Sequence, residues 1–338
     1  RQGRILPVLK LLSVIFQNRS EDMAKAKVKG KKFTFDDLEL ILLSLPTVVW
    51  FAIFSYLPMF GVIIAFKTYR LQPGKGFLYS LFKSKWAGFK NFEFLFASSD
   101  TWVMFRNTIG YNLIFIILGV VIPVSLAIMI SNLYSQRLGK VCQTAMFLPH
   151  FMSWVVASYF LFAFLSSEKG LVNSIIVSMG GTKVNWYGAE ALNYWPFFLV
   201  MMNIWKGTGY GMVVYLATIT GIDSTYYEAA VIDGATKWQQ TTKITIPLLK
   251  QIMVIMTIMA IGRIFNADFG LFYQVPKASG PLSNATLTMD VFIYNALTKM
   301  NNLGMSSAAA LFQSVCGCIT ICVANWVVSK IDSESAFF

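Results

Sequence analysis

The sequence is poor in charged side chains, which make up 13% of its 338 residues, whereas 56% are hydrophobic. A soluble protein of this size carries about 25% charged residues. The chain also has a single histidine, His150, and four cysteines, none of which form a C-x-x-C pair. These scarcities argue against multi-histidine metal chemistry, a zinc site and a disulfide framework, and they predict a protein buried in a lipid bilayer.

The sequence also lacks several functional patterns. No G-x-x-x-x-G-K-[ST] phosphate loop occurs in it, so the chain cannot hydrolyse ATP by itself. No internal repeat of the kind found in secondary transporters is visible. No cleavable signal peptide is recognisable near the start. The 28 lysines and arginines outnumber the 16 acidic residues, a net charge of +12 that favours contact with anionic lipid over nucleic acid.

Long apolar runs divide the chain. Each is long enough to cross a hydrocarbon core of about 30 Å. The predicted spans are residues 40–66, 102–133, 144–165, 195–220, 248–265 and 303–328. Residues 5–17 are too short to cross and are expected to lie as an interfacial helix, followed by a basic linker over 18–37. Arg137 and Lys140 are expected in a short turn between the second and third spans.

This pattern predicts an N-terminal segment over 1–39, a membrane domain over 40–330 and a short tail over 331–338. An even number of spans places both termini on one side of the membrane. The distribution of Lys and Arg favours that side as cytoplasmic, although the lysines of the loop 67–100 oppose it.

A polar segment over residues 221–247 separates the fourth and fifth spans. Asp223 or Ser224 can cap a helix that includes Glu228. Gly234 permits a sharp bend or close approach of another backbone, and Pro247 suits the first turn of the next helix. The segment is therefore predicted to form a helix, a bend and a second short helix outside the membrane.

The spacing of Glu228-Ala229-Ala230, Gly234 and Ile246-Pro247 resembles the EAA loop of the membrane subunits of binding-protein-dependent ABC importers. In that family the loop is a coupling helix, which inserts into a cytoplasmic ATPase. The resemblance therefore implies a coupling role for specific positions. They are Glu228, Ala229, Ala230, Asp233, Gly234, Ala235 and Trp238.

Polar residues inside the predicted spans are candidates for contact with a substrate, because they are costly in lipid. Amides, charges and aromatic rings together suit a carbohydrate. The candidates are Asn107 and Tyr111 in the second span, Asn203, Lys206, Gly207 and Tyr210 in the fourth, and Arg263, Asn266 and Asp268 at the end of the fifth. Packing between helices is the alternative explanation for each of them.

Further stretches extend the resemblance over nearly the whole chain from about residue 40. They are Phe105-Arg106-Asn107-Thr108, Phe147-Leu148-Pro149-His150, Asn203-Ile204-Trp205-Lys206-Gly207 and the run from Gly262 to Pro281. Together they are similar to the carbohydrate-uptake branch of ABC importer permeases, especially importers of oligosaccharides derived from polysaccharides. In related sugar importers the cargo lies between helices equivalent to the fourth and fifth spans. That position carries over to Asn203, Gly207, Tyr210, Arg263 and Asn266.

The resemblance implies an all-α membrane protein with six transmembrane helices and a cytoplasmic coupling helix, the type I importer permease fold. It implies a multi-pass protein of the bacterial cytoplasmic membrane with both termini cytoplasmic. The implied partners are a second homologous permease, two ATPase subunits that carry ATP and Mg²⁺, and an extracellular solute-binding protein that docks on loops 67–100, 166–194 and 266–302. The chain itself is expected to hold no catalytic residue, metal or cofactor.

Three alternatives remain open at this point. The chain could serve an ABC importer of a non-sugar solute, or it could be a secondary transporter. It could also be a membrane enzyme that acts on lipid-linked sugars, although such an enzyme needs a cluster of acids, bases or metal ligands.

Overall fold

The structure is a computed structural model that describes residues 35–70 and 72–331. The expected interfacial helix over 5–17, most of the basic linker over 18–37 and the tail after Ile331 lie outside these residues. The chain divides into two compact units, which meet in sequence at Gly61 and Val62. Each unit is described by itself.

The described residues of the first unit, 35–61, contain most of the first predicted span, and the last residues of that span belong to the second unit. Helix α2 (Phe35–Phe51) contains Pro46 and continues as a π-helical turn, η2 (Ala52–Tyr56), and then as the 3₁₀ helix η3 (Leu57–Phe66). The change to 3₁₀ geometry occurs beside Pro58, whose ring and missing N–H disfavour a regular α-helix. Residues Asp37–Phe66 are long and apolar enough to span a membrane.

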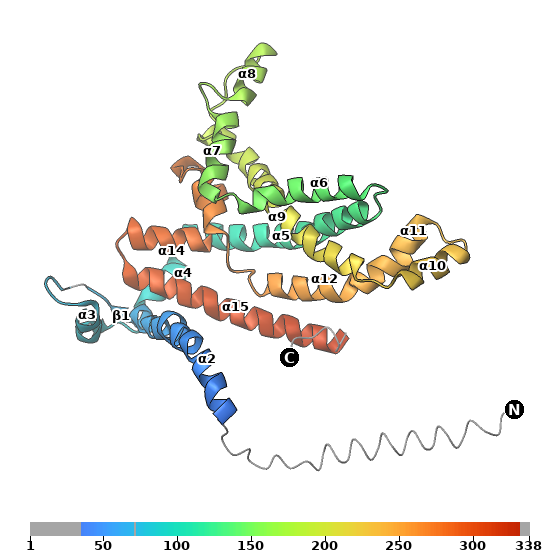
Figure 1. The fold of residues 1–338 in the computed structure, drawn as a ribbon. Helices are drawn as coiled ribbons and strands as arrows, with labels where there is room; N and C mark the ends of the chain where they lie inside the picture. Colours follow the sequence, from blue (N-terminus) through green and yellow to red (C-terminus); the bar gives the residue numbers. More distant parts are fainter. Residues whose placement is uncertain (1–34, 71, 332–338) are drawn as a thin grey trace. The chain divides into compact units, whose positions relative to one another are not determined.

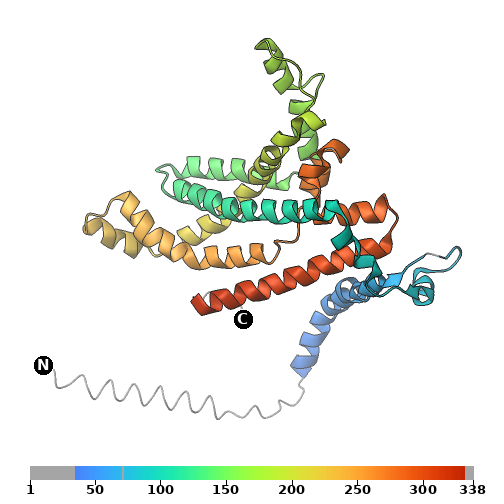
Figure 2. The same cartoon turned by 180° about the vertical axis from the view of Figure 1, so that it is seen from behind.

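The second unit is built around two long helices that pack side by side, α5 (Ser99–Ser131) and α9 (Trp195–Thr220) (Figures 1 and 2). Gly211 of α9 lets the helices approach closely, because a Cβ there would lie 3.1 Å from the ring of Pro123 in α5. The apolar cluster next to this contact contains Val124, Met212 and Tyr215. Small residues at a crossing point are typical of helix packing in membranes.

The third predicted span is wrong as a continuous helix. Helix α6 (Gln136–Phe147) passes through a 3₁₀ turn, η5 (Leu148–Phe151), to helix α7 (Trp154–Leu165), with a bend of 102°. Pro149 opens the turn, and the hydroxyl of Ser153 accepts a hydrogen bond from the Val156 N–H at 3.3 Å, which caps a new helix. Arg137 and Lys140 lie in α6 and not in a turn.

The fifth and sixth predicted spans form a neighbouring pair. Helix α11 (Lys237–Gln240), the π-helical turn η7 (Thr241–Thr245) and α12 (Ile246–Ile261) form one continuous helix, and α15 (Leu303–Ile331) packs against α12. Before α11 lies α10 (Ser224–Ile232), so the expected pair of short helices is present. The second of them continues without a break into the fifth span.

The three predicted loops on the other side contain regular structure. The first has strands β1 (Lys67–Thr68) and β2 (Lys85–Trp86), paired antiparallel, with α3 (Phe77–Lys83), η4 (Lys90–Phe92) and α4 (Phe94–Ala97). The second has α8 (Leu171–Ser178) and η6 (Ala189–Tyr194). The third has η8 (Gly270–Gln274), η9 (Gly280–Leu282), α13 (Ser283–Thr286) and α14 (Met289–Thr298).

Within the described residues, four helices are long and apolar enough to cross a membrane, or up to five if α6 and α7 count as one broken span. Helix α9 is not among them although it has 26 residues. Its polar and glycine-rich middle lowers its hydropathy, and that middle contains most of the fourth-span candidates for substrate contact.

Candidate functional site

The segment between α9 and α12 is a well-formed helical corner. The Asp223 carboxylate accepts the Thr225 N–H at 2.9 Å and caps α10. This bond holds the pKa of Asp223 below its usual value. Glu228 accepts a hydrogen bond from the Ser224 hydroxyl at 2.9 Å. The start of α10 is thus fixed by its own side chains.

The bend after α10 depends on Gly234, whose φ is +75°. The Ala235 N–H donates to the Ala230 carbonyl at 2.8 Å, and the Gly234 N–H donates to the Val231 carbonyl at 3.0 Å. These two bonds form a Schellman motif, in which the left-handed residue is usually glycine. A Cβ on Gly234 would meet nothing within 4 Å, so the constraint comes from the backbone conformation and not from crowding.

Helix α11 starts at once with a capping box between Thr236 and Gln239. The hydroxyls of Tyr227 and Thr245 lie 2.9 Å apart and tie α10 to the helix that becomes α12. Ile232 is 86% exposed and Trp238 is 75% exposed on this corner. Large exposed apolar side chains gathered on one segment mark a contact with a protein or with a membrane. The predicted coupling residues are thus brought together on one rigid corner.

Part of the predicted substrate set gathers where α9 meets the break between α6 and α7. The Lys206 ammonium donates to the His150 carbonyl at 3.0 Å and lies 5.2 Å from the ring centre of Trp154. The Tyr210 ring stacks on the His150 imidazole, with centroids 4.9 Å apart. Asp268 accepts a hydrogen bond from the Trp154 indole at 2.6 Å, which joins the segment after α12 to the same region.

Asp268 also holds its own turn. Its second oxygen accepts the N–H groups of Gly270 at 2.9 Å and Leu271 at 3.3 Å. Arg263 and Asn266 lie just before it, both exposed and without a side-chain hydrogen bond to the described residues. Within this segment, Asp268 is engaged in structure, whereas Arg263 and Asn266 are available to another molecule.

A hollow of about 150 Å³ lies between α5 and α9, lined by Asn203, Gly207 and Tyr210 together with Pro123. The Asn203 side chain is half-buried and makes no hydrogen bond to the described residues. A Cβ on Gly207 would meet nothing within 4 Å, whereas one on Gly209 would clash with the Met146 backbone. Gly209 therefore serves close packing, and Gly207 keeps open the hollow that Asn203 faces.

Asn107 and Tyr111 lie elsewhere and bind the protein itself. The Asn107 amide donates to the carbonyls of Asn284 and Leu287 at 3.0 Å each, and the Tyr111 hydroxyl donates to the Ala285 carbonyl at 2.9 Å. Both side chains are buried. These contacts fasten α5 to α13 and support the packing alternative for these two residues.

Sequence reasoning did not single out Trp154, which links Lys206 and Asp268, or the main-chain carbonyls that Asn107 and Tyr111 bind. A signal for Trp154 was present, because Pro149 and the capping Ser153 precede it and indicate a helix break. The carbonyl partners carry no signal, since every residue has one. Among the described residues, no group of three or more His, Cys, Asp or Glu could hold a metal ion.

Comparison with known proteins agrees with this arrangement. Residues 119–333 match the family described as "Binding-protein-dependent transport system inner membrane component". Protein LplB of Bacillus subtilis (strain 168) is 32% identical over 301 residues, which cover 89% of this chain and 92% of that protein. The polygalacturonan/rhamnogalacturonan transport system permease protein YteP of the same organism is 30% identical over 325 residues, 96% of each chain.

The fold also matches a solved structure. A chain from the crystal structure of a bacterial ABC transporter involved in the import of the acidic polysaccharide alginate aligns with a TM-score of 0.77 at 30% identity, covering 88% of this chain and 97% of that one. A second match, with a TM-score of 0.77 and 29% identity, is a chain of the alginate transporter in complex with an alginate pentasaccharide-bound periplasmic protein. The resemblance inferred from the sequence and the expected fold class are confirmed by these matches.

Proposed function

The chain belongs to the family of binding-protein-dependent transport system inner membrane components, and we propose that it is one of two different membrane subunits of an ATP-driven oligosaccharide importer. In this proposal an external binding protein delivers the sugar, and two separate ATPase subunits supply the energy. The coupling corner faces the cytoplasm, as do both termini.

The observation that carries the proposal is the corner formed by α10 and α11. Its apolar surface, which includes Ile232 and Trp238, offers a contact to a partner, and α11 continues through η7 into α12 without a break. A force applied to the corner is therefore transmitted along a helix that crosses the membrane. Transport requires such an element, because its position must change with the nucleotide state of the ATPase and with the side on which the substrate site is open.

The proposed cargo rests on the relatives and on the hollow at α9. Permease YteP is named for polygalacturonan and rhamnogalacturonan, and the solved relatives belong to an alginate importer. The hollow offers the free amide of Asn203 and the ring of Tyr210, which match the hydroxyls and the apolar face of a sugar. The same opening at Gly207 leaves space for cargo between this chain and the second permease.

The test is reconstitution of this chain with a second permease, an ATPase and a binding protein in liposomes. We expect ATP hydrolysis that rises when the sugar-loaded binding protein is added, together with uptake of labelled oligosaccharide. Stimulation by a binding protein loaded with an amino acid or a peptide, and not with a sugar, would contradict the cargo. Full activity of the chain without any ATPase would contradict the importer itself.

A further inference from the structure

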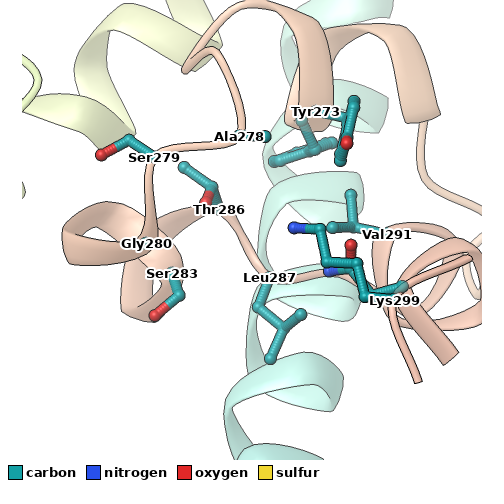
Figure 3. Close-up of a pocket in the computed structure, with 11 residues that line it drawn as sticks. Tyr273, Ala278, Ser279, Gly280, Ser283, Thr286, Leu287, Val291 and Lys299 are labelled. Atoms are coloured by element: carbon teal, nitrogen blue, oxygen red, sulfur yellow. The ribbon is translucent and has the colours of Figure 1, made fainter.

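A small hollow lies in the segment between α12 and α15, at the end of α12 away from the coupling corner. It measures about 90 Å³. Figure 3 shows Tyr273 at one end and Leu287 at the other. Val291 of α14 and Lys299, the residue that follows α14, face the chain around Ser279, Gly280 and Ser283. None of the candidate substrate residues discussed above lines this hollow.

Its lining combines three chemical groups. The Asn295 side-chain oxygen is buried and has no hydrogen-bond partner in the described structure. The Lys299 ammonium lies 5.8 Å from the Tyr273 ring centre, and no carboxylate of the described residues pairs with it. Buried polar atoms are nearly always satisfied, so an unpaired amide in a lined hollow indicates water or a ligand.

The wall opposite α14 is held firmly. Lys277 and Ala278 have φ values of 55° and 50°, a left-handed conformation that is unfavourable for residues other than glycine. The Lys277 ammonium lies 3.9 Å from the Tyr159 ring centre and 4.1 Å from that of Phe162. The Ser279 hydroxyl donates to the Tyr187 carbonyl at 2.8 Å. The contacts of Lys277 and Ser279 therefore fix the strained turn on both sides, and the hollow is preformed.

We propose that this hollow is a saccharide subsite on the outer side of the importer, which takes the charged edge of an acidic sugar unit. The volume is below that of a cavity of about 150 Å³ that admits benzene, so one edge of a pyranose enters and the rest of the ring stays outside. The carboxylate of the sugar accepts a charge-assisted hydrogen bond from the Lys299 ammonium, and a neighbouring sugar hydroxyl donates to the Asn295 side-chain oxygen. The Tyr273 ring covers the apolar face of the sugar.

The subsite selects acidic over neutral oligosaccharides as they pass from the binding protein to the membrane cavity. This proposal rests on the function proposed above for its place in transport, but binding at the hollow can be measured separately. Asn295 and Lys299 lie outside the coupling corner and the α9 hollow. Their substitution should therefore leave ATPase docking intact.

The experiment compares trigalacturonate with its methyl ester, which has the same ring and length but no charge. In the reconstituted importer, Lys299→Gln and the isosteric Asn295→Asp are expected to raise the half-saturating concentration for trigalacturonate uptake about tenfold and to leave that for the ester unchanged. The maximal stimulated ATPase rate should not change. Lys140→Gln, at an exposed lysine of α6 and outside the loops expected to dock the binding protein, is the control.

Direct binding is measured in parallel by saturation-transfer NMR, with the permease complex in nanodiscs and no binding protein. A weaker trigalacturonate signal in both variants than in the wild type, with an unchanged signal from the ester, supports the subsite even if uptake fails. The proposal would be overturned if Lys299→Gln left the half-saturating concentration of each sugar at its wild-type value and left the NMR signal unchanged. Failure of the wild type to import any oligosaccharide would instead contradict the proposed function.

Discussion

The Lys206 ammonium of α9 donates to the His150 carbonyl at 3.0 Å, at the break between α6 and α7. A carbonyl at a helix break has lost its intrahelical partner, and in a bilayer an unsatisfied group of this kind costs several kcal/mol. The Lys206 ammonium thus satisfies a carbonyl that the bend between α6 and α7 leaves without an intrahelical donor. This contact explains why a lysine lies in the middle of α9.

Replacing Lys206 with Met should destabilise the protein, because the His150 carbonyl is left without its donor. We expect a loss of about 1–3 kcal/mol, seen as a lower thermal unfolding midpoint in detergent. Lys140→Met, at an exposed position of α6, should change the midpoint little. If Lys206→Met kept the wild-type midpoint and only weakened sugar uptake, Lys206 would be a substrate contact and not a structural one.

Gly234 can be tested by a graded series. Asn tolerates the left-handed conformation, whereas this conformation costs about 1–2 kcal/mol for Ala and more for Val. Coupling should therefore decrease in the order Gly, Asn, Ala, Val. The measurement is co-purification of the ATPase and its stimulation by the loaded binding protein. Gly221→Ala is the control, because that residue is a C-cap with φ −84° and ordinary contacts. Unchanged stimulation in Gly234→Val would count against a coupling role.

The bounds of several helices and the position of the bend could be predicted from the sequence. The fourth span, 195–220, matches α9, and the bend at Gly234 follows from the special backbone freedom of glycine. Such features depend on nearby residues, which the sequence displays. The fifth and sixth spans agree with α12 and α15 to within a few residues for the same reason.

The features that sequence reasoning missed depend on distant contacts. The apolar run 144–165 has the length of a span, yet the break at Pro149 and Ser153 turns it through 102°. One contact at this bend comes from Lys206, which is far away in sequence. Likewise, the polarity of Asn107 and Tyr111 suggested a substrate, but their partners are main-chain carbonyls after residue 283, which no composition or spacing reveals.

Asn107 offers a test of that structural role. Asn107→Leu keeps the size but removes two donors. It leaves the Leu287 carbonyl unpaired, whereas the Asn284 carbonyl keeps a hydrogen bond from the Arg106 guanidinium at 2.7 Å. We expect a loss of about 1–3 kcal/mol for each buried group that is not rescued by water. Circular dichroism on heating in detergent measures it. A stable variant with a raised half-saturating sugar concentration would instead make Asn107 a ligand contact.

The glycines of α9 form a matched pair. Gly207→Leu places a side chain in the hollow beside Asn203, where a Cβ meets nothing within 4 Å, so the protein should fold and oligosaccharide uptake should fall. Gly209→Ala brings a methyl group onto the Met146 backbone, so it should prevent stable folding. Uptake and unfolding midpoints of both variants are measured together. Normal uptake by Gly207→Leu would show that sugar does not pass this hollow.

Asp290 should make stability depend on pH. Its carboxylate accepts the Ala267 N–H and a hydrogen bond from the Gln313 amide at 3.2 Å, but burial raises its pKa above the ordinary value of 3.8. The folded state therefore binds this proton more tightly than the unfolded state does. Its contribution to stability is fully present below pH 3.8 and is lost as the pH rises through the raised pKa of the folded protein.

Asp290→Asn removes this dependence while keeping an oxygen that can accept the Ala267 N–H. The unfolding midpoint of the variant minus that of the wild type should therefore increase as the pH rises above 3.8, and it should level off once Asp290 is ionised in the folded state. Taking the difference cancels the titration of all other groups. Asp100→Asn, at an exposed carboxylate in the first turn of α5, is the control. Parallel midpoint curves for the wild type and Asp290→Asn would mean that the Ala267 and Gln313 hydrogen bonds fully offset the cost of burying the charge.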